Sequence, residues 1–251
     1  MAELIVLGSS ASVPDAEHDT VSLALQGSDW AVLVECGGSP LQKLAQLGIG
    51  LEELQALILS HQHPDHIYGL PALVQGLWIG GRENPLPIYG PAQALDRAMA
   101  LLELLDLADR EGMFAVEWRP VPLREGREVG KWGEIRISAA PVVHGSNDTL
   151  ALRFENMETG RAAVYSADTE PCGALVRLAA GADLLLHEAT GEYPGHSTPA
   201  EAAEVAREAG VARLALIHYP VRGVNLEAWR LGAAEFPGPV TLAQEGDRYR
   251  L

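Results

Sequence analysis

The sequence predicts an α/β protein in which two sheets pack in layers, with helices on the outside. Apolar runs of strand length come in two series along the chain, with helical stretches between and after them. Hydrophobic residues make up 47% of the 251 residues, which is enough for a sizeable core and excludes a disordered chain. No low-complexity linker or solenoid repeat divides the sequence. We therefore expect residues 1–251 to form a single domain.

The first half of the chain predicts one series of strands. Gly27-Ser28-Asp29 joins two apolar runs and predicts a hairpin, and Ser39 and Pro40 fit the N-cap and first position of a helix. The expected strands are 3–7, 21–25, 30–35, 54–59, 86–89 and 113–121, and the expected helices are 40–47, 71–78 and 91–107.

The second half predicts another series. The turn Met157-Glu158-Thr159-Gly160 links two strands, while Thr198 and Glu201 have the spacing of a capping box at the start of a helix. The expected strands are 134–140, 150–155, 161–166, 183–187, 214–218 and 240–243, and the expected helices are 172–180, 199–209 and 225–236.

The composition limits the function classes. The formal net charge is −16, which disfavours a nucleic-acid binder because phosphate contacts need a basic surface. The uncharged run 67–81 is too short for a membrane span and contains Pro71, and the chain does not start like a signal peptide. Two cysteines, Cys36 and Cys172, cannot make a disulfide framework. We expect a soluble cytoplasmic protein.

The strongest functional signal is a dense group of metal-ligand residue types directly after the apolar run 56–60. It reads His61-Gln-His63-Pro-Asp65-His66. His61 and His63 can point the same way from an extended segment, which leaves Asp65 and His66 for a neighbouring position. One short loop at a strand end could thus supply ligands to two metal ions. Imidazole and carboxylate suit zinc, manganese or iron.

Three further ligand-type residues end apolar runs elsewhere in the chain. They are His144, Asp168 and His218. Each alone could equally be a structural polar residue, but residues at strand ends tend to gather at one edge of a sheet. Together with the first loop they predict a binuclear site.

These motifs resemble the metallo-β-lactamase superfamily, whose signature is His-x-His-x-Asp-His followed by a His, an Asp and a last His. The match is closest to its ribonuclease Z-like branch and runs in order from residue 4 to about residue 219. The matching stretches are Leu7-Gly-Ser-Ser-Ala-Ser-Val-Pro14, Ile88-Tyr-Gly-Pro91, Ser166-Ala-Asp168-Thr169, His187-Glu-Ala-Thr190 and Gly195-His-Ser-Thr198.

The resemblance implies a four-layered αββα sandwich with two divalent metal ions at one edge of the sheets. It assigns His61, His63 and His144 to one ion, Asp65, His66 and His218 to the other, and Asp168 to a bridging position. Two metals about 3.5–4 Å apart can hold a hydroxide between them and clamp the oxygens of an in-line displacement. Asp65 would orient the attacking water. Zinc is the expected metal, with manganese or iron as alternatives.

Glu188 and His196 match a pair that protonates the leaving oxygen in ribonuclease Z-like enzymes. A histidine oriented by a carboxylate is a credible general acid near neutral pH. The alternative is that His196 only helps to cap the next helix and that Glu188 is an exposed loop acid. His187 precedes Glu188 on the strand and is expected to be structural.

The sequence departs from the tRNA-processing members of the branch. Their basic stretch after the first loop is matched by the acidic Pro14-Asp-Ala-Glu-His-Asp19, and only 24 positions separate His144 from Asp168, too few for their tRNA-binding arm. Glu35 stands where the family usually has Asp. We therefore do not expect efficient tRNA binding. His18 could face the site or lie in a surface turn.

The function that we predict is hydrolysis of small phosphodiesters. The alternatives are hydrolysis of carboxylic esters, thioesters or lactones, RNA 3′-processing of the ribonuclease Z type, and a non-catalytic metal-binding domain. The resemblance also implies a homodimer. The run 67–81, with Leu70, Leu73, Leu77 and Trp78, could be its interface or equally part of the core.

Overall fold

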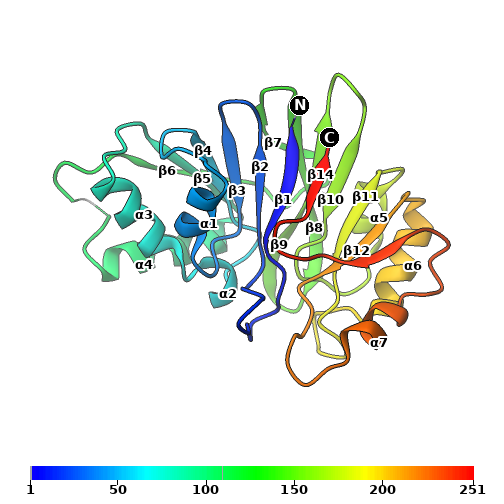
Figure 1. Ribbon diagram of the computed structural model, residues 1–251. Coiled ribbons are helices and arrows are strands. Elements are labelled where there is room, and N and C mark those ends of the chain that lie inside the picture. The colour runs from blue at the N-terminus through cyan, green and yellow to red at the C-terminus, as the bar shows by residue number, and fades with distance from the viewer. Residues whose placement is uncertain (1, 109) are drawn as a thin grey trace.

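The computed structural model describes residues 2–108 and 110–251 and confirms the predicted αββα sandwich. Two sheets pack face to face, and helices cover the outer face of each (Figure 1). The first sheet contains, in spatial order, β14 (Arg248–Arg250), β1 (Glu3–Gly8), β2 (Ser22–Gln26), β3 (Ala31–Val34), β4 (Leu54–Ile58), β5 (Leu86–Gly90) and β6 (Val116–Pro120). The second contains β13 (Val240–Leu242), β12 (Leu214–Ile217), β11 (Leu184–Glu188), β10 (Ala162–Tyr165), β9 (Asn147–Asn156), β8 (Ile135–His144) and β7 (Arg127–Trp132).

The helices divide between the two outer layers (Figure 1). One side of the molecule carries α1 (Pro40–Gln46), α2 (Pro64–Ile67), α3 (Leu70–Ile79) and α4 (Ala92–Leu104). The other carries α5 (Gly173–Ala179), α6 (Pro199–Ala209) and α7 (Leu226–Leu231). The capping box predicted for α6 is present, because the Thr198 side chain accepts from the backbone N–H of Glu201 and the Glu201 side chain accepts from that of Thr198.

Three apolar clusters hold the layers together. One lies between the sheets and includes Leu4, Phe154 and Tyr165, all fully buried. The others lie between each sheet and its helices. Leu70, Leu73 and Leu77 of α3 are fully buried in one of these clusters. These three residues of the run 67–81 therefore belong to the core and not to a dimer interface. The homodimer stays a prediction.

Each sheet is half antiparallel and half parallel, and the parallel halves determine at which edge the loops with the candidate site residues lie. Strands β3 to β6 run parallel in the first sheet, and β10 to β13 run parallel in the second. The carboxyl ends of parallel strands meet at one edge of a sheet. The segments after β4, β10, β11 and β12 therefore converge at the same edge of the sandwich.

Several sequence expectations need correction. The strands β7 and β14 were not predicted, because polar and exposed residues break their alternation and both lie at sheet edges. Helix α4 ends at Leu104 instead of residue 107, and α7 ends at Leu231 instead of residue 236. Ser39 occupies the N-cap of α1 but its side chain makes no capping hydrogen bond. In the described part of the chain, no helix is long and apolar enough to cross a membrane.

Candidate metal centre

The His-rich motif follows β4 and changes conformation half-way along. His61 and His63 leave the strand in extended chain, as predicted, with His63 at φ −65° and ψ 148°. Pro64 then begins the short helix α2, where a proline is tolerated because its missing N–H would be unsatisfied anyway. The sequence predicted a loop throughout, but Asp65 and His66 lie inside this helix. The helical turn directs them to a second position beside the first.

The other candidate ligands come from the facing sheet. His144 is the last residue of β8, Asp168 follows β10 and His218 follows β12. Ala167 and His218 have φ values of 52° and 50°, in the left-handed region. This conformation costs a non-glycine residue roughly 1–2 kcal/mol and persists where surrounding contacts enforce it, as they often do at functional sites.

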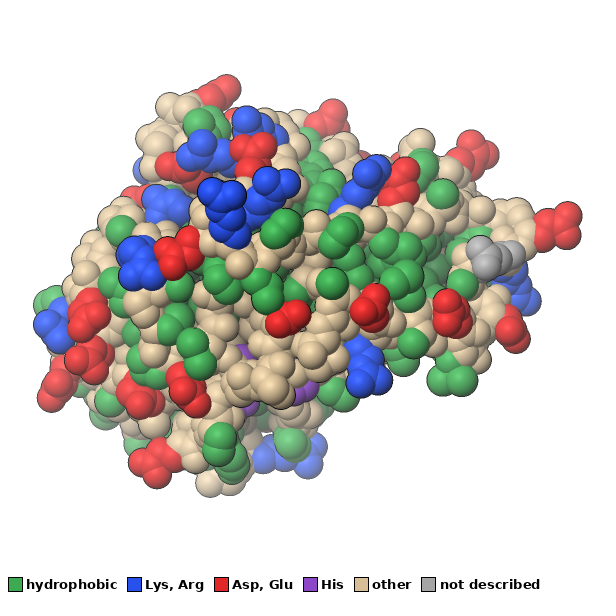
Figure 2. All heavy atoms as spheres, turned by 180° about the vertical axis from the view of Figure 1, so that it is seen from behind, with side chains coloured by type: hydrophobic (Ala, Val, Ile, Leu, Met, Phe, Trp, Pro, Cys, Tyr) green, Lys and Arg blue, Asp and Glu red, His purple; other side chains and the backbone are tan. Residues whose placement is uncertain are grey.

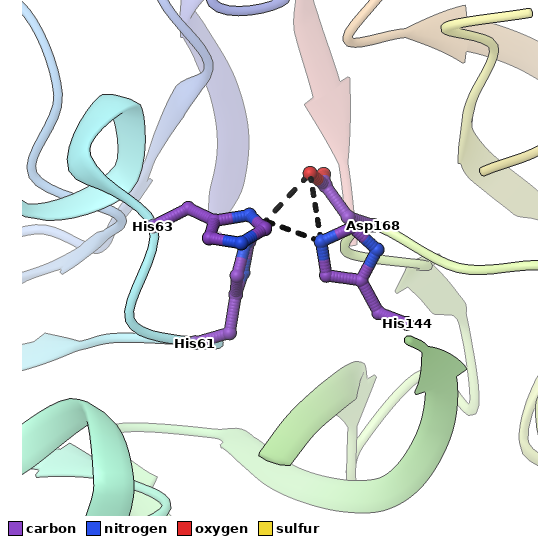
Figure 3. Close-up of side chains that lie close together, drawn as sticks. All are labelled: His61, His63, His144 and Asp168. Carbon is purple, nitrogen blue, oxygen red and sulfur yellow. Dashed lines mark hydrogen bonds and ion pairs between the residues drawn. The ribbon is translucent and has the colours of Figure 1, made fainter. Parts of the chain in front are cut away.

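The first group of ligand atoms contains His61, His63, His144 and Asp168. All four offer a nitrogen or oxygen within 4.8 Å of the others (Figure 3). His63 Nδ1 lies 3.0 Å from His144 Nε2. Asp168 Oδ2 lies 3.7 Å from His61 Nε2 and 3.8 Å from His144 Nε2. The sequence-predicted members of the first metal position therefore lie around one point.

The second group contains Asp65, His66 and His218. Asp65 Oδ2 lies 3.3 Å from His218 Nε2 and 3.7 Å from His66 Nε2. Asp168 joins this group as well, because its Oδ2 is 3.5 Å from His66 Nε2 and its Oδ1 is 3.5 Å from His218 Nδ1. Asp168 thus lies between the two groups, where the resemblance assigns a bridging ligand. Two overlapping groups also arise, Glu35 with His61 and His66, and Asp168 with His196 and His218.

These residues fit a pair of divalent cations. Ligand atoms that surround an ion at about 2.0–2.2 Å are separated by roughly 3–3.6 Å, close to the spacings in both groups. His61 Nε2, His66 Nε2 and Asp168 Oδ1 are buried without a hydrogen-bond partner in the described part of the chain. Such atoms are costly to bury unless something satisfies them. Cations between the two groups would satisfy all three.

Charge and burial divide the histidines into two kinds. Burial, together with neighbouring histidines, lowers the pKa of His61 well below its usual value and lowers the pKa of His63. Both are therefore neutral at pH 7 and can present a lone pair to a metal. Burial also disfavours the charged form of His66 and His218, but nearby carboxylates, Asp168 foremost, raise the pKa of both.

The pKa values of the two site carboxylates, Asp65 and Asp168, are lowered. Burial disfavours their charged form, yet the surrounding histidines lower the pKa of Asp65 and hold that of Asp168 well below its usual range. Both carboxylates are therefore ionised, and the centre attracts positive charge. This is the electrostatic environment that a cation site needs.

Neutral groups that the sequence did not reveal orient the ligands. The ring Nδ1 of His61 lies 2.9 Å from Ser60 Oγ, and that of His144 lies 2.6 Å from the Gly195 carbonyl oxygen. His218 Nδ1 lies 2.8 Å from Thr190 Oγ1. Such contacts fix the ring orientation and tautomer of a metal-bound histidine. Serine, threonine and backbone groups carry no sequence signal that separates this role from ordinary surface polarity.

A chain of amides reaches His63 from outside the centre. Arg97 Nε donates to Gln62 Oε1 at 3.2 Å, and Gln62 Nε2 donates to Asn147 Oδ1 at 2.9 Å. Asn147 Nδ2 in turn lies 3.1 Å from His63 Nε2. Because Nδ1 of this ring faces His144, the amide chain holds the ring from its other side.

Glu35, singled out as a departure from the family, lies against His66. Its Oε1 is 3.3 Å from His66 Nδ1, and its Oε2 accepts from the Ser60 N–H at 3.2 Å. Its φ of 63° turns the chain sharply after β3. A buried carboxylate behind a ligating histidine raises the basicity of the ring. Glu35 is therefore positioned to support His66 from behind.

Glu188 and His196 form the predicted pair. Glu188 is fully buried, so it is not an exposed loop acid, and its Oε1 lies 3.0 Å from His196 Nδ1. Backbone N–H groups of Thr169, Thr190 and Ser197 also donate to this carboxylate and hold it in place. His196 Nδ1 lies 4.0 Å from Asp168 Oδ2, so the pair borders the metal centre.

Two other histidines lie outside these groups. His187 is fully buried, and its Nδ1 lies 2.7 Å from the carbonyl oxygen of Glu188. His18 lies 2.9 Å from Asp15 and packs edge-on against Tyr219, with ring centroids 6.3 Å apart. Within the described residues, neither of these two contacts of His18 is to a candidate metal ligand.

Hollows flank the centre on two sides. One, of about 500 Å³, is lined by His63, Tyr68, Arg97, Leu101 and Asn147 among others. Another, of about 570 Å³, is lined by residues that include Ser12, Tyr193, His196, Val221 and Arg222. Figure 2 shows histidine atoms in a recess of the surface, with basic side chains gathered mainly in another part of this face. Solvent can therefore reach the border of the centre.

Comparison with known proteins gives the family. The model of the β-lactamase superfamily domain matches residues 31–219, which include the His-rich motif, Asp168 and His218. The chain belongs to the metallo-β-lactamase superfamily. A ribonuclease Z of Methanothermobacter thermautotrophicus is 31% identical over 96% of this chain and 94% of its own length. With its paired His and Asp groups, this member of the superfamily is a metal-dependent hydrolase.

Solved structures agree on the fold. The metallo-β-lactamase fold protein YhfI from Bacillus subtilis is 27% identical and superposes with a TM-score of 0.80, covering 99% of this chain and 98% of its own. A structure described as a new diphosphatase from the PhnP family has a TM-score of 0.79 and 20% identity, and it covers 100% of this chain and 98% of its own. At that identity the second likeness shows the fold alone.

Proposed function

We propose that this hydrolase cleaves small phosphodiesters with two divalent cations, zinc in the first place and manganese or iron as alternatives. The observation that carries the proposal is the Glu188–His196 pair at the border of the candidate metal centre. Cations held by the two ligand groups would supply a hydroxide nucleophile at neutral pH and neutralise charge on the phosphodiester. A side chain of the protein must then donate a proton to the leaving oxygen.

We infer that His196 protonates that oxygen. Its Nδ1 is engaged by the Glu188 carboxylate at 3.0 Å, which leaves Nε2 as the nitrogen that can carry a proton toward substrate. The carboxylate fixes the orientation and tautomer of the ring, as in other His–carboxylate pairs. With 15% of its side chain exposed, His196 can exchange protons with solvent between turnovers. A leaving alkoxide needs such a proton.

The size of the surroundings supports a small substrate. The hollows beside His63 and His196, of about 500 and 570 Å³, are in the range of small-molecule sites. The second hollow contains Arg222, whose guanidinium can contact an anionic substrate. A phosphodiester bound across the centre would place one substituent in each hollow.

RNA 3′-processing is the second candidate, and the similarity to the archaeal ribonuclease Z favours it. Two features oppose it. The segment between His144 and Asp168 contains only β9, β10 and a turn, with no room for an arm. The loop Pro14-Asp-Ala-Glu-His-Asp19 is acidic where tRNA would approach. We therefore expect tRNA precursors to be poor substrates.

A substrate panel on one metal-analysed preparation tests the proposal. It compares bis(p-nitrophenyl) phosphate, a dinucleoside phosphate, a 3′-extended tRNA precursor and p-nitrophenyl butyrate, each with wild type and Asp168→Ala. We expect turnover of the two small phosphodiesters, little cleavage of the precursor, and loss of turnover in Asp168→Ala. Preferred hydrolysis of the carboxylic ester, or efficient cleavage of the precursor, would overturn the assignment.

A further inference from the structure

A pocket rich in arginine lies at the edge of the sandwich opposite the metal centre. Its volume is about 500 Å³, and its lining includes Arg161, Arg213, Arg248, Arg250, Asp183 and Tyr249. The chain as a whole has a net charge of −16 and only 18 basic residues, so four arginines around one pocket are a marked concentration.

The topology brings these arginines together. Arg161 and Arg213 directly precede the parallel strands β10 and β12, so both lie at the amino edge of the second sheet. The candidate metal ligands lie at the carboxyl ends of the same strands. Strands of four or five residues separate the two edges by roughly 15 Å. The pocket is therefore distinct from the metal centre, which lies near α2 at the lower edge of Figure 1, whereas both chain ends lie at the upper edge.

The other two arginines come from the first sheet. Arg248 and Arg250 are alternate residues of the edge strand β14, so their side chains leave the same face. Arg250 pairs in register with Glu3 of β1. The pocket is thus framed by one pair of arginines from each sheet.

Three carboxylates nearby compensate only part of this charge, and one of them, Asp247, accepts a hydrogen bond from the Tyr249 hydroxyl at 3.4 Å. Glu3 lies 3.0 Å from Arg248 and 3.2 Å from Arg250, so a single carboxylate serves both. Asp183 uses its carboxylate to accept the N–H of Ala162.

The second pair of arginines lacks such partners. Within residues 2–108 and 110–251, no carboxylate lies at ion-pair distance from Arg161 or Arg213. Four arginines against Glu3, Asp183 and Asp247 leave an excess of positive charge around the pocket. Arg161 and Arg213 are both exposed, and Arg213 Nε donates to the Asp183 carbonyl oxygen at 3.5 Å.

We propose that this pocket is a second binding site, which takes a compact oligophosphate. Guanidinium groups bind phosphate oxygens through paired hydrogen bonds, and Arg is the residue best suited to this geometry. Two pairs of arginines, one from each sheet, suit a ligand with at least two phosphate groups, and the volume of about 500 Å³ exceeds the need of one phosphate. Its position at the other edge makes the site independent of the proposed hydrolytic function.

The test measures binding of inorganic tripolyphosphate by equilibrium dialysis to the purified, metal-containing protein at physiological salt. The variant is Arg161→Gln with Arg213→Gln. The matched control is Arg119→Gln with Arg207→Gln, which removes the same charge from two exposed arginines elsewhere. Binding at the metal centre would add the same separate step to all three isotherms, so the comparison is made on the affinity of the step that depends on the pocket.

We expect the pocket variant to bind tripolyphosphate at least tenfold more weakly than wild type, and the control to change affinity less than twofold. The single variants Arg161→Gln and Arg213→Gln, each expected to lose at least threefold, serve if the double variant does not fold. Equal affinities, or equal losses in pocket variant and control, would overturn the proposal. A short single-stranded oligonucleotide that needs these arginines while tripolyphosphate does not would replace it with a nucleic-acid site.

Discussion

Replacing His196 by glutamine isolates the proton donor from the rest of the centre. His196 lies at the border of the candidate ligand groups and contacts Glu188 Oε1 at 3.0 Å. The loss of this charge-assisted hydrogen bond costs about 1.5–3 kcal/mol of stability if glutamine does not replace it. Glu188 keeps its three backbone N–H donors, so we expect the variant to stay folded.

The expected loss of activity depends on the leaving group. A positioned general acid contributes about 10²- to 10⁴-fold to a rate, which corresponds to about 2.7–5.4 kcal/mol. This loss should apply in full to a dinucleoside phosphate, whose alkoxide leaves poorly without a proton. It should fall to about tenfold or less for bis(p-nitrophenyl) phosphate, because nitrophenolate leaves unprotonated.

Steady-state kcat/KM on the two substrates gives the readout. His187→Gln is the matched control, because it removes a neighbouring histidine whose ring contacts the backbone carbonyl of Glu188 and not its carboxylate, and we expect near wild-type kcat/KM on both. An equal loss on both substrates in His196→Gln would refute the role of His196 as proton donor and leave it a structural residue.

Three further predictions concern groups around the centre. Gly195→Ala places a Cβ 2.9 Å from His144 Nδ1 at a φ of 85°, so we expect about 1–2 kcal/mol lower stability in thermal unfolding and weaker metal binding; unchanged values would contradict the geometry. Glu35→Ala removes the carboxylate 3.3 Å from His66 Nδ1, and we expect 10- to 100-fold weaker metal binding in a chelator competition, whereas an unaltered affinity would show that the contact has no orienting role. Burial lowers the pKa of His187 below its ordinary value of about 6.5, so below that pH the unfolded chain takes up a proton that the folded chain refuses. The stability of wild type relative to His187→Gln should therefore fall between pH 7.5 and pH 5.5 in urea unfolding, and a constant difference would contradict the shift.

Most of the fold could be predicted because its elements carry strong local signals. The buried strands have apolar runs. The capping box before α6 and the Gly160 turn between β9 and β10 have conformations that only a few residue types favour, so these residue types signal them. The edge strands β7 and β14 could not be predicted, because an exposed strand that pairs on one side needs no hydrophobic alternation. Helix α2 was missed because four residues give no periodicity.

The candidate site divides in the same way. Its ligand types could be found because His and Asp at strand ends are chemically distinctive, and the structure brings both His61 and His218 to Asp168, as their places at strand ends predicted. The groups that orient them could not be found. The Gly195 carbonyl and the Asn147 amide act through position alone, which depends on contacts between residues far apart in the sequence.

In the proposed mechanism, two cations held by the His and Asp groups are required for hydrolysis. The most direct test is the metal content of the purified protein by mass spectrometry, measured with phosphodiester turnover before and after chelation. We predict two divalent ions per chain, loss of turnover as they are removed, and recovery of turnover when zinc, manganese or iron is restored. Full turnover by protein with negligible metal, or a content that never exceeds one ion per chain in active protein, would contradict the account.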